Sequence, residues 1–128
     1  MPCYGSTTEV GFLMRSPIDV ARKHGIPHVA EGELCLIGSA DANDFVDACT
    51  TERLAILSVA GFVWGQHGAE PEETASRDFS DLIAQDWDDF LVLSLVQAHR
   101  FLRTFTIDGT RRLFAFSLMA REEYPSVS

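Results

Sequence analysis

Apolar residues between Asp86 and Arg103 recur at spacings of three and four, the most regular hydrophobic pattern in the chain. These spacings place them on one face of a helix. Asp86 is suited to cap its start, and the carboxylate of Asp89 can reach back toward the freed amides. Arg100 and Arg103 suit the last turn, where the helix dipole favours cations. The pattern predicts a helix buried on most sides, with an apolar face formed by Trp87, Phe90, Leu91, Leu95, Ala98, Phe101 and Leu102 and widened by Leu93 and Val96.

An alternating pattern follows this helix. Phe105 and Ile107 alternate with two threonines, and Asp108-Gly109 supplies the positive φ angles that a two-residue turn requires. We therefore expect a C-terminal β-hairpin with strands at Thr104–Ile107 and Thr110–Phe116. The return strand is expected to be central in its sheet, because both of its faces carry apolar residues: Phe114, Phe116 and Leu118 on one face, Leu113 and Ala115 on the other.

Start and stop signals divide the first part of the chain into short elements. Ser16-Pro17 favours a helix start, and His24-Gly25 favours its end. Short apolar runs predict strands at Val10–Arg15 and Glu33–Ile37. Ser39 offers a cap for a short helix whose apolar side consists of Ala42, Phe45, Val46 and Cys49.

Residues 54–64 are apolar throughout, so periodicity does not separate a buried strand from a buried helix. The β-branched and aromatic residues favour a strand slightly, over Leu54–Val59, while Thr51-Glu52-Arg53 favours a helix start. The glycines of Gly65–Gly68 are typical of a loop.

Residues 69–85 have the pattern of an amphipathic helix. Acids surround Pro71 near its start, and four apolar residues follow at helical spacing: Ala75, Phe79, Leu82 and Ile83. Because no Gly or Pro separates this segment from Asp86, the pattern fits either one helix over 71–103 or two helices. Together these elements predict a single α+β domain over 1–128, with a small, mainly antiparallel sheet that includes the C-terminal hairpin and is covered by helices. Residues 1–9 and 121–128 are expected to be loose.

Composition narrows the classes of partner. The 128 residues are 46% hydrophobic and carry a net charge of −9, with a pI near 4.7. An acidic chain lacks the basic surface that phosphate contacts need, so we expect no direct binding to nucleic acid or to an anionic membrane. The apolar runs are shorter than the roughly 20 residues of a membrane span. Three cysteines without CxxC spacing, and no secretory signal, predict a cytoplasmic, intracellular protein with reduced thiols.

Motifs of the common enzyme classes are absent from the sequence. It has no Gly-rich phosphate loop, no GxSxG, no HExxH and no paired CxxC. Asp41-x-Asn43 resembles the start of a calcium loop, but Phe45 and Val46 stand where an oxygen ligand and a turn glycine are needed. We therefore expect a non-enzymatic protein and assign no catalytic residue, no metal ligand and no cofactor.

Charge is concentrated in one segment. Residues 69–89 contain eight acids and only one base, Arg77, so the helix predicted there would have an anionic face. Trp64 and His67, just before it, place an aromatic anchor and a titratable ring beside loop glycines. The two features together point to a protein-docking surface.

Our first hypothesis is a small acidic protein-binding module of the inhibitor, immunity, adaptor or chaperone type. It would dock a partner with a basic surface through the anionic helical face, and in the sharpest version of this hypothesis the face would mimic the phosphates of a nucleic acid. The apolar helix at 86–103 is also compatible with a homodimer. The partner-binding residues are predicted to be Glu70, Glu72, Glu73, Asp78, Asp81, Asp88, Trp64 and His67.

The alternative hypothesis is a small enzyme or small-molecule-binding protein. Its pocket would lie between the hairpin sheet and the apolar helices, with His67 or His99 as the acid or base. An arginine of the hairpin, Arg111 or Arg112, would hold an anionic substrate.

Overall fold

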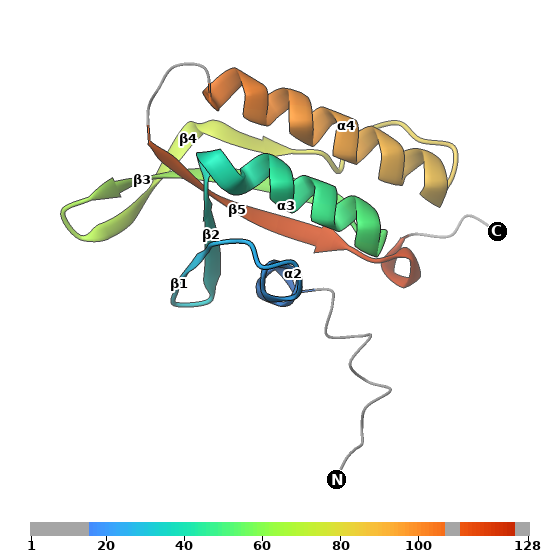
Figure 1. Ribbon diagram of the computed structural model, residues 1–128. Helices are drawn as coiled ribbons and strands as arrows, with labels where there is room; N and C mark the ends of the chain where they lie inside the picture. The colour runs from blue at the N-terminus through green and yellow to red at the C-terminus, as the bar shows by residue number, and fades with distance from the viewer. Residues whose placement is uncertain (1–15, 107–110, 125–128) are drawn as a thin grey trace, which may run out of the picture.

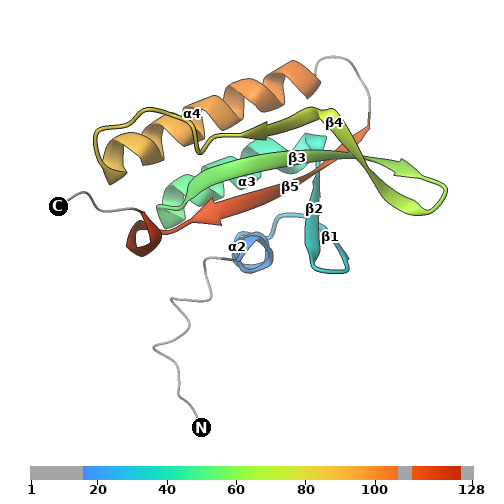
Figure 2. The same cartoon turned by 180° about the vertical axis from the view of Figure 1, so that it is seen from behind.

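The computed structural model describes residues 16–106 and 111–124, in which five strands form one antiparallel sheet with two helices, Ser39–Glu52 and Trp87–Thr106, packed on one face (Figures 1 and 2). This arrangement confirms the α+β class and the antiparallel sheet. The strands are β1 (Val29–Glu31), β2 (Leu34–Gly38), β3 (Ala55–Gly65), β4 (Gly68–Asp78) and β5 (Arg112–Met119). The helices are α2 (Pro17–Lys23), α3 (Ser39–Glu52), α4 (Trp87–Thr106) and the short 3-10 helix η2 (Arg121–Glu123).

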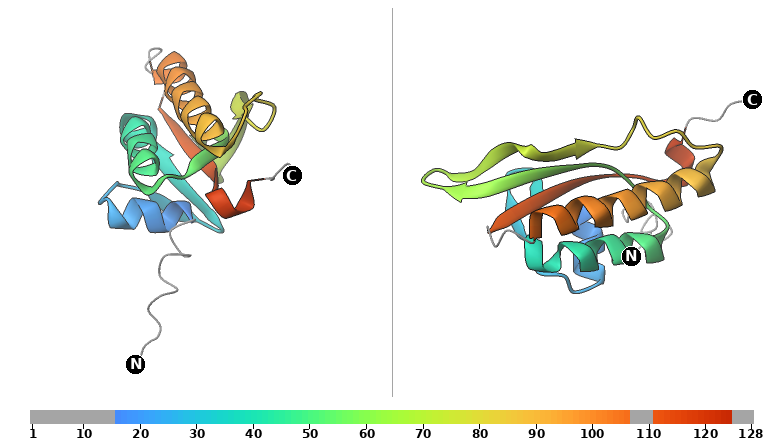
Figure 3. Two further views of the ribbon diagram at one scale, coloured as in Figure 1. Left: turned by 90° about the vertical axis from the view of Figure 1, so that its right-hand side faces the viewer. Right: turned by 90° about the horizontal axis from the view of Figure 1, so that it is seen from above.

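The strand order is β1-β2-β5-β3-β4, so β5 occupies the centre and β1 and β4 are the edges. This position confirms the prediction that the last strand, expected over Thr110–Phe116, is central in the sheet. Phe114 and Phe116 of β5 are buried, and the Phe116 ring lies 4.7 Å from the ring of Phe45 in α3. On the alternate positions Ala115 is only partly buried and Ser117 is exposed. The helices α3 and α4 thus cover one face of the sheet, as Figure 3 shows from the end.

The start of α4 follows its prediction. Asp86 Oδ1 accepts a hydrogen bond from the Asp89 amide at 2.9 Å, and Asp89 Oδ2 accepts one from the Gln85 amide at 3.0 Å. All predicted members of the apolar face are buried or partly buried. The prediction that Val96 widens this face was wrong, because Val96 is 46% exposed and Val92, one turn earlier, is also exposed. The helix is amphipathic rather than enclosed.

The predicted C-terminal hairpin is corrected by the structure. Thr104, Phe105 and Thr106 belong to α4, and β5 pairs with β2 and β3 rather than with the segment before it. Local contacts explain the difference: the Phe105 ring lies 4.8 Å from the ring of Phe101, one turn earlier, and Thr104 Oγ1 donates to the Arg100 carbonyl at 3.2 Å. Residues 107–110, which include Asp108-Gly109, lie outside the described residues.

The helix predicted over residues 69–85 was also wrong. Gly68–Asp78 forms β4, which pairs with β3, and no helix begins between the end of β4 and Trp87. The two-residue hairpin lies here instead, with Gln66 and His67 between the paired glycines 65 and 68. Gly68 has φ +105°, a conformation that side-chain-bearing residues rarely adopt. The slight preference for a strand over 54–59 is confirmed, and residues 71–103 contain one helix preceded by a strand.

Other boundaries in the described residues are close to their predictions. The helix α2 starts and ends where predicted, and β2 covers nearly the predicted strand. Gly38 is the N-cap of α3, so Ser39 is its first residue rather than its cap. In the segment 121–128, which is expected to be loose, the Tyr124 ring lies 5.8 Å from that of Trp87 and 5.5 Å from that of Phe90. The predicted strand at Val10–Arg15 and the ends 1–9 and 125–128 lie outside the described residues.

The helix α4 also completes the hydrogen bonding of the sheet. Ser94 is fully buried; its Oγ accepts a hydrogen bond from the Ile56 amide at 3.1 Å and donates to the Leu91 carbonyl at 3.1 Å. Ile56 precedes the first β3 residue that pairs with β4, so a helical hydroxyl satisfies an amide of the sheet there. Within the described ranges, no helix is long and apolar enough to cross a membrane.

Candidate functional site

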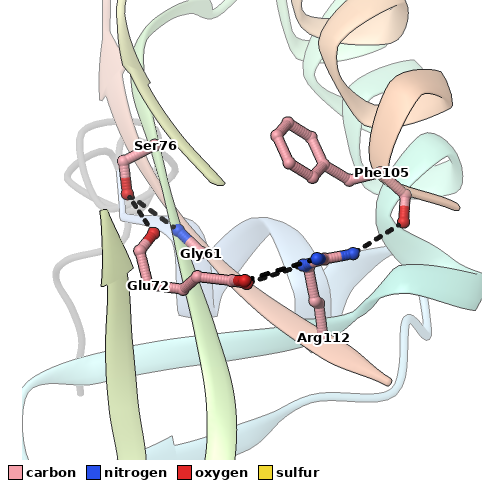
Figure 4. Close-up of polar contacts among 5 residues, drawn as sticks. All are labelled: Gly61, Glu72, Ser76, Phe105 and Arg112. Atoms are coloured by element: carbon pink, nitrogen blue, oxygen red, sulfur yellow. Dashed lines mark hydrogen bonds and ion pairs between the residues drawn. The ribbon is translucent and has the colours of Figure 1, made fainter. Parts of the chain in front are cut away.

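The β3–β4 hairpin holds most of the residues that the sequence singled out, and it contains a large bulge. Gly61 pairs with Glu72, whereas Val59 pairs with Arg77, so residues 73–76 of β4 lie opposite one residue of β3. The Ser76 hydroxyl bridges the bulge, since it accepts from the Gly61 amide at 3.2 Å and donates to the Glu72 carbonyl at 3.3 Å (Figure 4). A Cβ at position 61 would lie 2.5 Å from the Ala75 carbonyl oxygen, so this position requires glycine.

Arg112 connects three elements behind the hairpin. Its Nε and Nη2 donate to the two carboxylate oxygens of Glu72 at 2.6 and 3.3 Å, and its Nη1 donates to the Phe105 carbonyl at 3.1 Å (Figure 4). The guanidinium also lies 5.0 Å from the centre of the Phe105 ring. The side chain of Arg112 is only 8% exposed and that of Glu72 is 27% exposed, so this bidentate pair is largely shielded from solvent. It joins β5, the edge strand β4 and the last turn of α4.

The predicted partner-binding acids divide into two groups. Glu72 is held by Arg112, and Asp88 forms an exposed ion pair with Arg53 at 2.6 Å. Glu70, Glu73, Asp78 and Asp81 are exposed, the first three on β4 and the last just after it. The amide of Ser80 donates to Asp78 Oδ1 at 2.8 Å, and this hydrogen bond lowers the pKa of that carboxyl. The anionic surface is therefore formed by the edge strand β4 and the residues just after it. The prediction that a helix carries this surface was wrong.

Trp64 and His67 lie on the same hairpin, and both are exposed; Trp64 has 60% of its surface open to solvent. The first residues of β4 are attached to the opposite edge of the sheet. Glu31 of β1 accepts a hydrogen bond from the Ala69 amide at 3.2 Å through its Oε1. The two edge strands thus approach each other, and the hairpin is held beside β1.

A cavity of about 420 Å³ lies where β2 leads into α3 and β5 begins. Trp64, Val29, Leu113 and Arg111 line it together with Arg112 and the first residues of α3. The structure thus brings together Trp64 and the two arginines, which the sequence had placed in different hypotheses. A second cavity, of about 470 Å³, is lined by small residues of β3 and β5, including Ser58, Ala60, Ala115 and Ser117, and by Ile18 of α2.

The two histidines of the alternative hypothesis do not line either of these cavities. His67 lies in the hairpin turn. His99 lies between α3 and α4, with its Nδ1 at 2.8 Å from Asn43 Oδ1 and its Nε2 at 3.1 Å from Asp47 Oδ1. Among the residues that the structure describes, no three His, Cys, Asp or Glu side chains are grouped to hold a metal ion.

Several residues of this region had weak signals or none in the sequence. Gly61 was visible as an isolated glycine within an apolar run, which is typical of a bulge or a close backbone approach. Glu31 and Ser76 gave no signal, because their partners are far away in the chain or depend on the bulge. No protein-family model and no curated protein matches this chain.

Proposed function

We propose that the protein is a non-enzymatic binding module that docks a protein partner through the β3–β4 hairpin and the edge strand β4. The observation that supports this proposal best is the 60% exposure of Trp64, in a hairpin beside a row of exposed acids. An exposed tryptophan offers a large rigid apolar surface, and residues of this type dominate the binding energy of protein interfaces.

The exposed acids indicate the chemistry of the partner. Glu70, Glu73, Asp78 and Asp81 carry charge on the outer strand and beyond it, in a chain with a net charge of −9. Such a surface speeds association with a basic partner and disfavours acidic ones. The partner would have a basic surface, as nucleic-acid-binding proteins do, and the carboxylates would take the place of phosphates.

The decisive experiment is affinity capture from an extract of the source cell at low and high salt. The bait is compared with two variants, Trp64→Ala and the charge reversal Glu70→Lys/Glu73→Lys. A third variant, Asp44→Lys, reverses an exposed acid of α3 outside the hairpin and is the matched control. We expect one stoichiometric protein that is retained by the control, lost by both hairpin variants and released at high salt.

Retention of the same partner by both hairpin variants would refute docking at this surface. A complex unchanged from low to molar salt would refute electrostatic steering.

One specific observation supports the alternative function, a small enzyme or small-molecule-binding protein: the 420 Å³ cavity that Arg111 lines. It favours binding of a small molecule rather than catalysis by His67 or His99, since neither histidine lines that cavity.

A further inference from the structure

We propose that the cavity between Trp64 and Arg111 binds a ligand that combines an apolar body with a carboxylate. Its volume of about 420 Å³ lies within the range of roughly 300 to 1,000 Å³ that is usual for small-molecule pockets. This site goes beyond the proposed docking surface, because it also requires Arg111 and Leu113 of the β5 region, which docking on the hairpin does not involve.

The apolar part of the ligand is indicated by the walls of the cavity. Trp64, Val29 and Leu113 line it. Trp64 is 60% exposed and Val29 is 44% exposed, so both leave apolar surface in contact with water. A ligand that covers this surface gains roughly 25 cal/mol for each Å² of apolar area removed from water.

The anionic part is indicated by Arg111. This arginine is exposed at the rim, and in the described part of the chain it has neither an ion-pair partner nor a hydrogen-bond partner. Its neighbour Arg112, in contrast, is held by Glu72. A guanidinium binds a carboxylate through two parallel hydrogen bonds, and Arg111 is available for this.

The start of α3 adds a second group that favours an anion at the same wall. Gly38, Ser39 and Ala40 line the cavity, and Gly38 is the N-cap. A glycine has no side chain to accept a hydrogen bond from the first amides, and no side-chain cap is present. These amides and the helix dipole therefore add partial positive charge beside Arg111.

Two sources present the required groups: a free small carboxylate and the C-terminal residue of a polypeptide. The probes that separate them are phenylbutyrate and the peptide acetyl-Gly-Gly-Phe with a free carboxyl group. Their neutral counterparts, phenylbutyramide and the amidated peptide, keep the apolar body and remove the charge.

The measurement is the indole N–H resonance of Trp64 in heteronuclear NMR spectra as each probe is added. We expect an acid to shift this resonance and to leave that of the buried Trp87 in place. The neutral counterpart should bind roughly tenfold more weakly, as loss of a charge-assisted hydrogen bond predicts. Arg111→Gln should cause a similar loss, whereas Arg100→Gln, at an exposed arginine of α4, should not.

The two sources are distinguished by which acid binds more tightly, and preference for either one supports the site. The proposal is overturned if none of the probes shifts the Trp64 resonance, if acid and amide bind equally, or if Arg111→Gln binds as tightly as the unaltered protein. The Glu70→Lys/Glu73→Lys variant, which tests partner docking, leaves every residue named as lining this cavity intact. Failure of one proposal is therefore visible without failure of the other.

Discussion

Gly61 shows how a single missing side chain allows the hairpin to form. The bulge of β4 brings the backbone of Ala75 against Gly61, and the Ser76 hydroxyl takes the Gly61 amide in place of a strand carbonyl. The contact is with backbone rather than with the end of a flexible side chain, so it has little freedom to give way.

Gly61→Ala should therefore destabilise the protein by about 2 to 4 kcal/mol, since either the bulge or β3 must move. Gly65→Ala is the matched control. The three atoms nearest to a Cβ at position 65 would all belong to the carboxylate end of Glu70, which can rotate away, so we expect a much smaller loss. Chemical denaturation of the two variants tests this, and equal losses would contradict the steric explanation.

Glu52 makes stability depend on pH through its two partners. Its Oε2 lies 2.9 Å from Lys23 Nζ and 2.8 Å from His24 Nε2, and the hydrogen bonds from Lys23 and then His24 lower the pKa of its carboxyl below the ordinary value of 4.5. A carboxyl whose pKa is lowered by folding stabilises the native state above its unfolded pKa. That stabilisation is lost as the pH falls through the folded value.

Glu52→Gln should reduce the free energy of unfolding by about 1 kcal/mol at neutral pH, a modest value because Lys23 is largely exposed. The difference from the unaltered protein should shrink as the pH falls below 4.5 and vanish in stronger acid. Denaturation curves at a series of pH values measure this. Glu33→Gln, at an exposed turn position, should show no such convergence, and a constant difference for Glu52→Gln would contradict the assignment.

Among elements, the contact of Arg112 with Glu72 and Phe105 determines how α4, β4 and β5 are joined. One side chain of the central strand binds the edge strand and the last turn of the helix that covers the sheet. The pair is largely shielded, so each partner depends on the other for compensation of its charge.

Arg112→Met should destabilise the protein by about 2 to 4 kcal/mol, because it leaves the Glu72 carboxylate without its cation. The double variant Arg112→Met/Glu72→Met should lose less than the single variant, because the carboxylate that would lack its cation is removed as well. Denaturation of the two single variants and the double variant gives the coupling energy. A double variant that loses the sum of the single losses would contradict this account.

The elements that sequence patterns predicted well are those fixed by local contacts. The capping of α4 by Asp86 and Asp89 and the end of α2 at His24-Gly25 depend on residues a few positions apart. The segment 69–85 was predicted wrongly because acids near Pro71 suit a helix start and an edge strand equally well. Pairing with β3 decides between them, and that pairing depends on the register and the bulge.

The candidate site was predictable in its residues but not in its geometry. Trp64, Arg111 and Arg112 stood out because of their type, yet their shared cavity exists only because β3, β5 and the start of α3 meet. Glu31 carries no local signal at all, since its hydrogen bond to Ala69 spans 38 positions.

At the scale of the whole molecule, helices cover one face of the sheet and leave parts of the strands accessible for binding. The helices α3 and α4 lie on one face, and the large exposed apolar side chains of the strands, those of Trp64, Val29 and Leu34, remain accessible. The acids of β4 lie on the strand that pairs with the strand of Trp64, and Arg111, just before β5, lines the same cavity as Trp64. A protein and a small carboxylate would therefore meet this molecule at neighbouring places, and each could affect binding of the other through Trp64.

The central position of β5 has a consequence for biosynthesis. A ribosome that has synthesised the chain through Asp78 has delivered β1, β2, β3 and β4, but β5, which lies between β2 and β3, comes after α4. Until Met119 has left the exit tunnel, the inner edges of the two hairpins have no strand to bind, and their apolar faces lack Phe114 and Phe116. We expect the domain to fold only after β5 has been synthesised. Until then the nascent chain exposes apolar surface and unpaired strand edges, which chaperones would bind.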